Sequence, residues 1–136
     1  MSNHEESIYE QIGGEATIRR LVDEFYARVE QDPVLRPGFP DDLEPGKEWQ
    51  FLFLSQYFGG PAIYNAERGH PRLRARHMPF GIDRRVQEAW LGNMLEAIDV
   101  VGIEEPARTK MREYFIRSSE FLINRFEPES AGEADR

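Results

Sequence analysis

Hydrophobic residues recur at helical spacing along most of this 136-residue chain. From about Glu15 to Gln31, apolar side chains lie three or four positions apart with charged residues between them. This pattern predicts an amphipathic helix that ends at Asp32-Pro33. The next helix, from about 45 to 58, is apolar nearly all round, so we expect other elements to cover more than one of its sides. The side chains of the first helix expected to face the core are Ile18, Leu21, Val22, Phe25, Tyr26 and Val29.

The remaining segments complete an all-α picture without strands, repeats or a domain linker. One or two helical turns are predicted over residues 7–12, before Gly13-Gly14. A short connection bounded by prolines is predicted over residues 33–40, and a loop over residues 62–69. Asp83 is placed to cap a helix that runs to about Val101. A last helix is expected from about 105 to 126. Its predicted inward side chains are Met111, Tyr114, Phe115, Phe121, Leu122 and Phe126.

Composition and charge reduce the number of functions that this chain could have. The length fits a single domain, expected over residues 1–126, followed by a disordered acidic tail over 127–136. The formal net charge is −8, and removing the tail leaves −5, so nucleic acid or an anionic membrane is not expected as a partner. There is no cysteine, which excludes disulfides and thiol chemistry. With neither a signal-peptide pattern nor a membrane-length apolar run, we expect a soluble, cytoplasmic protein.

One short basic stretch, residues 69–80, stands apart from this acidic background. Pro71 suits the first turn of a helix and Pro79 ends it, so His77 falls in the last turn of a short helix. Leu73 shares a face with His77, and Arg74 and Arg76 flank that face. A histidine in this setting could ligate haem iron, with arginines near the propionates, or it could be a partly buried histidine in a basic surface helix. A nucleic-acid patch needs a basic domain, which this is not.

Three polar side chains interrupt predicted apolar faces. Tyr26 follows Phe25 on the first long helix, Gln50 breaks a nearly all-apolar helix, and Trp90 lies in the middle of an apolar stripe. Each carries a donor that must be satisfied if it is buried. A backbone carbonyl could be the partner of each. Alternatively, all three could donate to oxygen bound at ferrous haem, which carries partial negative charge.

Several motifs together resemble the second group of truncated haemoglobins, over about residues 8–124. No single motif is specific, but their order and spacing are. The run around His77 and the Gly-Gly-Pro stop after the second long helix are the longest matches. The motifs that carry the resemblance are Gly13-Gly14, Phe25-Tyr26, Gln56-Tyr57-Phe58-Gly59-Gly60-Pro61, Gly69-His70-Pro71-Arg72-Leu73-Arg74, Arg76-His77, Pro79-Phe80 and Ala89-Trp90-Leu91.

The resemblance implies a truncated globin fold, a two-over-two helical sandwich enclosing a b-type haem with His77 as the proximal iron ligand. It assigns no catalytic residue. On the ligand side it implies Tyr26, Gln50 and Trp90, with Phe39 on the haem face and Gly46 where other globins often carry a distal histidine. The side chains expected to contact the cofactor elsewhere, including its propionates, are Leu54, Tyr64, His70, Leu73, Arg76 and Met94.

Two positions resemble one branch of the group, the one found in bacilli and their relatives. Many members carry tyrosine where this chain has Phe39, and leucine where it has Gln50. Trp49 replaces a basic residue that often lies next to that position, which removes one candidate propionate contact. Functions inferred for tyrosine-rich pockets therefore transfer poorly to this chain.

The function expected from these residues is binding of O2, and of CO or NO, at ferrous haem, with high affinity and slow release. The alternative is a redox enzyme, a nitric oxide dioxygenase or a peroxidase-like protein, which would need an external reductase because the chain has no flavin or nicotinamide motif. An interaction module without haem is a third possibility. We expect a monomer or a homodimer.

Overall fold

The structure, a computed structural model, describes residues 6–68 and 82–121. These residues form helices and connecting turns, without a strand among them, as the hydrophobic pattern predicts. Among the described helices, none has both the length and the apolar character needed to cross a bilayer. In chain order the elements are α1 (Ile8–Gln11), α2 (Glu15–Gln31), the 3-10 helix η1 (Arg36–Gly38), α3 (Glu44–Tyr57), α4 (Ile63–Arg68), α6 (Arg84–Val101) and α7 (Ala107–Phe121).

Capping residues set the ends of these helices. Ser7 caps α1, with its hydroxyl accepting from the backbone N–H of Glu10 at 3.1 Å and the Glu10 carboxylate accepting from the N–H of Ser7 at 3.1 Å. Asp83 caps α6 by accepting from the N–H of Val86 at 2.9 Å. Gly102 ends α6 in the left-handed conformation, with φ 85°. The predicted start and end of α6 are therefore confirmed.

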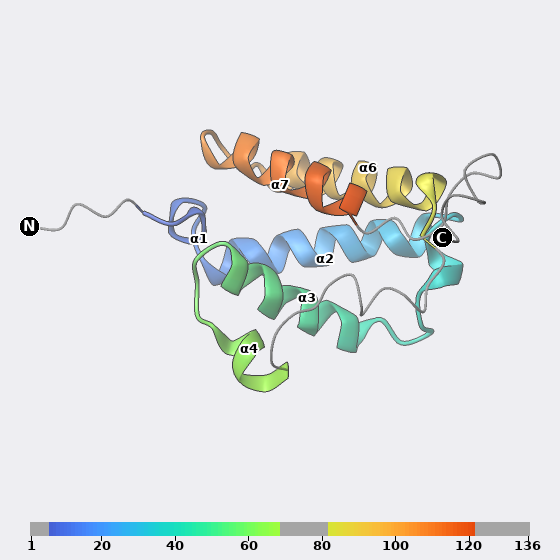
Figure 1. Cartoon of the computed structure of the whole chain (residues 1–136), viewed down its shortest axis with the longest axis horizontal. Coiled ribbons are helices and arrows are strands. Elements are labelled where there is room, and N and C mark those ends of the chain that lie inside the picture. The colour runs from blue at the N-terminus through green and yellow to red at the C-terminus, as the bar shows by residue number, and fades with distance from the viewer. Residues whose placement is uncertain (1–5, 69–81, 122–136) are drawn as a thin grey trace, which may run out of the picture.

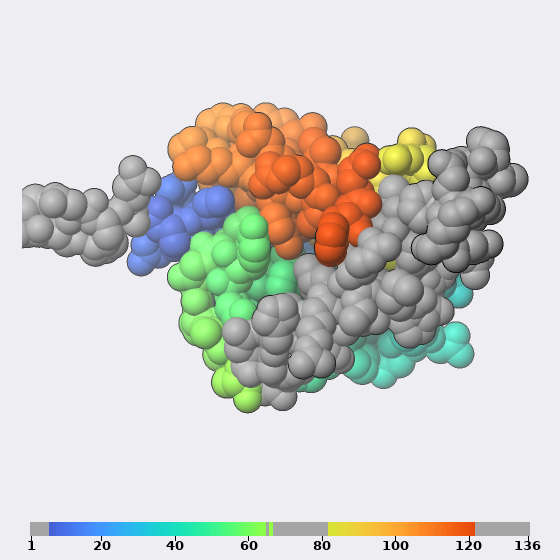
Figure 2. Space-filling model, viewed as in Figure 1, coloured from blue at the N-terminus to red at the C-terminus, as the bar shows by residue number. Residues whose placement is uncertain are grey.

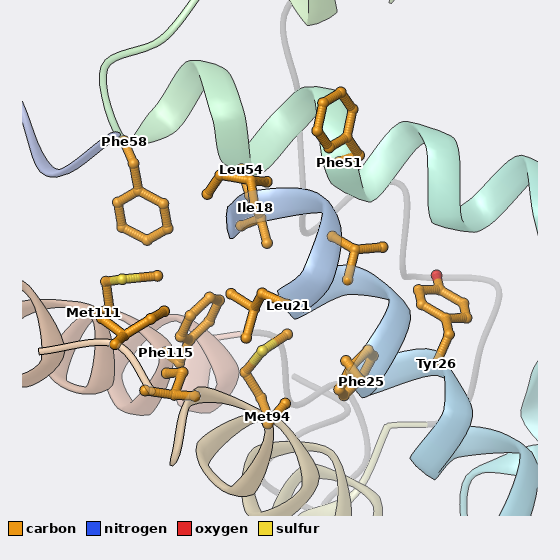
Figure 3. Packing of buried hydrophobic residues seen from close by; sticks show 14 of the residues in the cluster. Ile18, Leu21, Phe25, Tyr26, Phe51, Leu54, Phe58, Met94, Met111 and Phe115 are labelled. Atoms are coloured by element: carbon orange, nitrogen blue, oxygen red, sulfur yellow. The ribbon is translucent and has the colours of Figure 1, made fainter. Parts of the chain in front are cut away.

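Helix α2 lies in the middle of the molecule, with α3 on one side and the pair α6 and α7 on the other (Figure 1). The core fills the spaces on both sides of α2 and is almost entirely apolar (Figure 3). Burial of this apolar surface is the dominant stabilising contribution. The large side chains that are fully buried in this core are Ile18, Leu21, Val22, Phe25, Val29, Leu35, Met94, Ile98, Met111 and Phe115.

The loop predicted over residues 62–69 is wrong, because Ile63–Arg68 forms the short helix α4. Two turns are too few to show a helical period in the sequence. Tertiary contacts explain this helix instead. The buried ring of Tyr64 packs on Trp49 and Phe53 of α3, with ring centroids 5.9 Å and 5.5 Å apart.

The inward orientation predicted for Phe121 is also wrong, since this side chain is 63% exposed. Inward residues of α7 follow a spacing of four, from Met111 and Phe115 to Ser119. Phe121 falls two positions beyond that stripe. The buried stripe therefore continues to the polar Ser119, and Phe121, which was predicted to face inward, lies outside it.

Ser119 has a partner across the interface of α6 and α7. The side-chain amide of Gln87 donates to its hydroxyl at 2.9 Å, and both residues are buried. Ser119→Ala should lower the free energy of unfolding by about 1–3 kcal/mol, because it leaves the buried Gln87 donor without its acceptor. Urea unfolding followed by circular dichroism measures this. The matched control is Ser118→Ala, at a half-buried hydroxyl, and equal stabilities of both variants would contradict the argument.

Candidate functional site

Tyr26 is the polar side chain that α2 brings into the core. It is 7% exposed, and its ring makes edge contacts with Phe25 at 5.5 Å and with Phe39 at 5.9 Å. Burial raises the pKa of Tyr26 to about 12, since the phenolate would lose its hydration. The hydroxyl therefore keeps its proton, and with it the ability to donate a hydrogen bond, at any physiological pH.

Phe39 reaches this ring through a tightly held turn. Its N–H donates to the carbonyl of Arg36 at 3.1 Å, closing η1. The guanidinium of Arg36 then donates to the carbonyls of Phe39, Pro40 and Asp41 at 3.0–3.2 Å. One arginine thus satisfies three carbonyls of an irregular segment and fixes where Phe39 lies.

Helix α3 faces the Tyr26 hydroxyl at Gly46, and Gln50 follows one turn further along the same helix. In Figure 3 the hydroxyl points toward α3. A Cβ at Gly46 would lie 2.9 Å from that oxygen, closer than real Cβ contacts come. Glycine is therefore required here for the close approach of helix and hydroxyl, rather than for its backbone conformation.

The Gln50 carbonyl oxygen, Oε1, is buried and has no hydrogen-bond partner among the residues that the structure describes. Such an atom carries a desolvation cost unless a further partner satisfies it. An amide can present either its oxygen or its NH2 group after a half turn about its last bond. Gln50 can therefore accept from a donor such as the Tyr26 hydroxyl, or turn its own donor toward a bound group.

Trp90 enters from α6 and meets the same cluster through Phe25. The ring centroids of Phe25 and Trp90 lie 5.1 Å apart, and Phe25 is completely buried. Phe25 therefore contacts both Tyr26 and Trp90 and fixes their relative positions. Sequence reasoning treated it as ordinary core and missed this role, although its place directly before Tyr26 is the available signal.

A second feature that the sequence did not reveal fixes α6 on α2. The side-chain amide of Asn93 donates to the Asp32 carboxylate at 2.8 Å and to the Ala89 carbonyl at 2.8 Å. The hydrogen bond from Asn93 is the first cause of a lowered pKa of Asp32. Because Asn93 lies one turn beyond Trp90, this bond helps to set the position of Trp90 over Phe25.

The other residues predicted to belong to the site divide into two sets, those that the structure describes and those that lie outside it. Leu54 and Met94 are buried in the core, Leu54 on α3 and Met94 on α6, and Tyr64 is buried on α4. The structure thus brings Tyr26, Gly46, Phe39 and Trp90 together, directly or through Phe25, with Gln50 one turn from Gly46. The four remaining predictions, His70, Leu73, Arg76 and His77, lie outside the described residues.

The contact between Gly46 and Tyr26 gives a stability prediction. Gly46→Ala alone should gain little, because the added Cβ displaces the Tyr26 hydroxyl. In a Tyr26→Phe background that oxygen is absent, so the same substitution should stabilise by up to about 1 kcal/mol through helix propensity. Unfolding free energies of the wild type, both single variants and the double variant measure the coupling. An equal effect of Gly46→Ala in both backgrounds would contradict the contact.

Comparison with known proteins identifies the family to which this chain belongs. Residues 7–123 match the family model described as bacterial-like globin. The group 2 truncated haemoglobin YjbI of Bacillus subtilis is 44% identical over 121 residues, covering 89% of this chain and 91% of that protein. A haemoglobin structure from the thermophilic phototrophic bacterium Chloroflexus aurantiacus superposes with a TM-score of 0.88 at 61% identity, covering 89% of this chain and 100% of that one. A group II truncated haemoglobin of Bacillus anthracis gives 0.89 at 42% identity, over 92% of this chain and 96% of that one.

The chain therefore belongs to the bacterial-like globin family, and the recognition of a group II truncated haemoglobin from its motifs is confirmed. The expected all-α truncated globin fold is confirmed with it. Membership supports a haem-binding globin and implies that small diatomic ligands bind at the haem. The residues of this chain fit such a group, since the buried Gln50 oxygen lacks a partner among the described residues and the amide therefore has hydrogen-bonding capacity left for a bound group.

Proposed function

We propose that this globin binds b-type haem through His77 and holds O2, CO or NO at the ferrous iron, with Tyr26, Gln50 and Trp90 as the polar groups on the ligand side. Haem supplies the iron to which the diatomic ligand binds. Phe39 packs on the haem face, and Gly46 leaves room beside the Tyr26 hydroxyl. In this proposal the protein acts in the cytoplasm and releases oxygen slowly.

The family pattern implies the remaining contacts of the proposed site, and the charge and apolar character of the residues suit those contacts. Arg76, with Tyr64 and His70, would meet the haem propionates, because a guanidinium pairs well with carboxylates. Apolar contacts with the ring would come from Leu73, next to the proximal ligand, and from the buried Leu54 and Met94. These assignments rest on the family pattern of the sequence.

The observation that carries the proposal is the unsatisfied buried oxygen of Gln50, one turn from the glycine that faces the Tyr26 hydroxyl. Buried polar groups are normally hydrogen-bonded, so this amide has capacity left for a further partner, to which it can present its NH2 donor after a half turn about its last bond. Tyr26 keeps its donor because its pKa is about 12, and the indole of Trp90 can only donate. Donors suit bound oxygen, which carries partial negative charge.

Slow release follows from the number of donors. A hydrogen bond to a charged group contributes about 1.5–3 kcal/mol, so two such bonds would slow oxygen dissociation by about a hundredfold or more. A related structure from Bacillus subtilis, 42% identical to this chain, is described as an oxygen-avid truncated haemoglobin. That description of a relative supports high affinity here.

The same donors favour an alternative function, a redox enzyme that uses bound oxygen or peroxide. Long-lived bound oxygen is a substrate for oxidation of nitric oxide, and ferric haem can react with peroxide. Either cycle would need an external reductase. Return of the ferric to the ferrous protein in cell extract under substrate turnover would favour the enzyme, and a ferrous protein stable in air would favour oxygen binding.

The experiment that tests the main proposal is a visible absorption spectrum of the haem-loaded protein, first ferric, then reduced, then exposed to oxygen. A Soret band with the spectral changes of a reversible ferrous oxygen complex is the expected result. A protein that retains no haem after gel filtration would overturn the proposal. Haem retention without reversible oxygen binding would overturn its oxygen-binding part only.

A further inference from the structure

The outward face of α7 carries charged side chains of alternating sign. They follow one another at spacings of three and four residues, on the side of the helix opposite its buried positions, so they form one line along it. All are exposed, and in Figure 2 α7, coloured orange to red, forms part of the molecular surface. We call these residues the charged stripe, and its members are Lys110, Glu113, Arg117 and Glu120.

Most of the charged stripe has no ionic partner in the part of the chain that the structure describes. Neither Lys110, Glu113 nor Arg117 forms an ion pair with another described residue. Neighbouring members lie about one turn apart and have opposite charges, so pairing along the helix is the ordinary expectation for such a surface. The structure does not show that pairing.

Charged side chains of α7 that reach α6, in contrast, are paired. Arg108 donates to the Asp99 carboxylate at 2.6 Å, and Arg84 donates to the Glu120 carboxylate at 2.7 Å. Arg84 therefore holds the last member of the charged stripe in place while leaving it about half exposed. The other three members face away from the rest of the described molecule, and a partner for them has to come from outside.

The order of charges in the stripe fits a second copy of the same helix. Lys110 and Glu120 lie five residues on either side of residue 115, and Glu113 and Arg117 lie two residues on either side. In an antiparallel pair of α7 helices related by a two-fold axis level with residue 115, each Lys110 faces Glu120 of the second copy, and each Glu113 faces Arg117. All four facing pairs then have opposite charges. Parallel helices would place every charge opposite an identical one.

Ile116 adds an apolar contact at the centre of this arrangement. Its side chain is 41% exposed and lies beside the charged stripe, one residue from the level of the axis. Because a helix rises about 1.5 Å per residue, the two Ile116 side chains would be offset by only about 3 Å along the paired helices. They would therefore pack against each other, with two charged pairs on either side along the helix.

We propose that the outward face of α7 is a self-association surface, on which a second copy of this chain binds antiparallel through the charged stripe and Ile116. This inference goes beyond the proposed function and does not depend on haem. One pair of helices buries less surface than the roughly 1,200–2,000 Å² of a typical stable interface, so the dimer should be reversible. Its population should rise with protein concentration.

Charge reversal tests the pairing sharply, because symmetry makes each substitution act twice. In Glu113→Lys, a lysine faces Arg117 of the second copy on both sides of the axis. In Arg117→Glu, two carboxylates face each other on both sides. Neither variant should associate with itself as the wild type does. A mixture of the two restores opposite charges at both places and should form a heterodimer, and the double variant Glu113→Lys/Arg117→Glu restores them within one chain.

Sedimentation velocity of the haem-loaded full chain, between about 5 and 500 μM, measures the dissociation constant of each dimer. Absorbance at 280 nm keeps the readout independent of haem, and circular dichroism checks the fold of each variant. Each single charge reversal should raise the dissociation constant about tenfold or more, since two attractive pairs become repulsive. The mixture and the double variant should recover association. The control Glu30→Lys makes the same change of charge at an exposed position of α2 and should dimerise like the wild type.

A wild type that stays monomeric over the whole concentration range overturns the proposal. Undiminished dimers in both single variants overturn it as well, because they would place the interface on another face. If the single variants dissociate but neither the mixture nor the double variant recovers, the antiparallel pairing is wrong. Dimerisation as expected in a chain that retains no haem would support this proposal and overturn the proposed function alone.

Discussion

His77→Ala should lose haem far more readily than the wild type, because it removes the only side chain proposed to bond the iron. The apolar contacts from Leu54 and Met94 would remain, so weak retention rather than complete failure to bind is expected. Added imidazole should partly restore ligation by occupying the vacated space. Transfer of haem to an excess of apomyoglobin, followed in the Soret region, measures the rate of loss.

The matched control for this variant is His70→Ala, which removes the other histidine of the same basic stretch. It should retain haem nearly as well as the wild type, since only a propionate contact is proposed for His70. The ligand assignment is wrong if His77→Ala keeps wild-type spectra and affinity while His70→Ala abolishes them.

Trp90→Phe should release oxygen faster by about ten- to a hundredfold, the range that corresponds to one lost charge-assisted hydrogen bond of about 1.5–3 kcal/mol. The phenyl ring can keep the contacts with Phe25 and Phe115, so the fold should persist. Carbon monoxide release should change less, because bound carbon monoxide carries less negative charge than bound oxygen. Stopped-flow dissociation of each ligand measures both rates.

Trp49→Phe is the control for this prediction. Its ring contacts Tyr64, and none of the ring contacts among the described residues joins it to Phe25, Tyr26 or Trp90, so this variant should release oxygen at close to the wild-type rate. Equal acceleration of oxygen and carbon monoxide release in Trp90→Phe would mean that the pocket had opened, rather than that a donor had been lost.

Hydrophobic periodicity predicted the long helices well. The residues of α2 expected in the core, from Ile18 to Val29, are all buried, and Asp83 and Gly102 bound α6 as expected. Long helices can be predicted from sequence because their hydrophobic residues recur over several turns. The short helix α4 has too few turns for a helical period to show in its sequence. Its formation depends on packing of Tyr64 against α3, which local sequence does not reveal.

For the candidate site, the sequence proposes a set of residues but not their arrangement. Family motifs pointed to Tyr26, Gln50 and Trp90, whereas the central position of Phe25 between Tyr26 and Trp90 emerged only from ring contacts between helices. The buried hydrogen bond between Gln87 and Ser119 was missed for a related reason. A polar residue on a helix looks solvent-facing until its partner on another helix is known.

The central claim is that the polar groups of this pocket serve a bound ligand, and oxygen dissociation rates in a double-mutant cycle of Tyr26→Phe and Gln50→Leu test it most directly. If both side chains act on bound oxygen through one network, each single variant should alter the release rate, and the effects should be strongly non-additive. Gln50 could, for example, take the donor role once the Tyr26 hydroxyl is removed. Wild-type release rates in both single variants and in the double variant would contradict the account and leave these residues with a packing role alone.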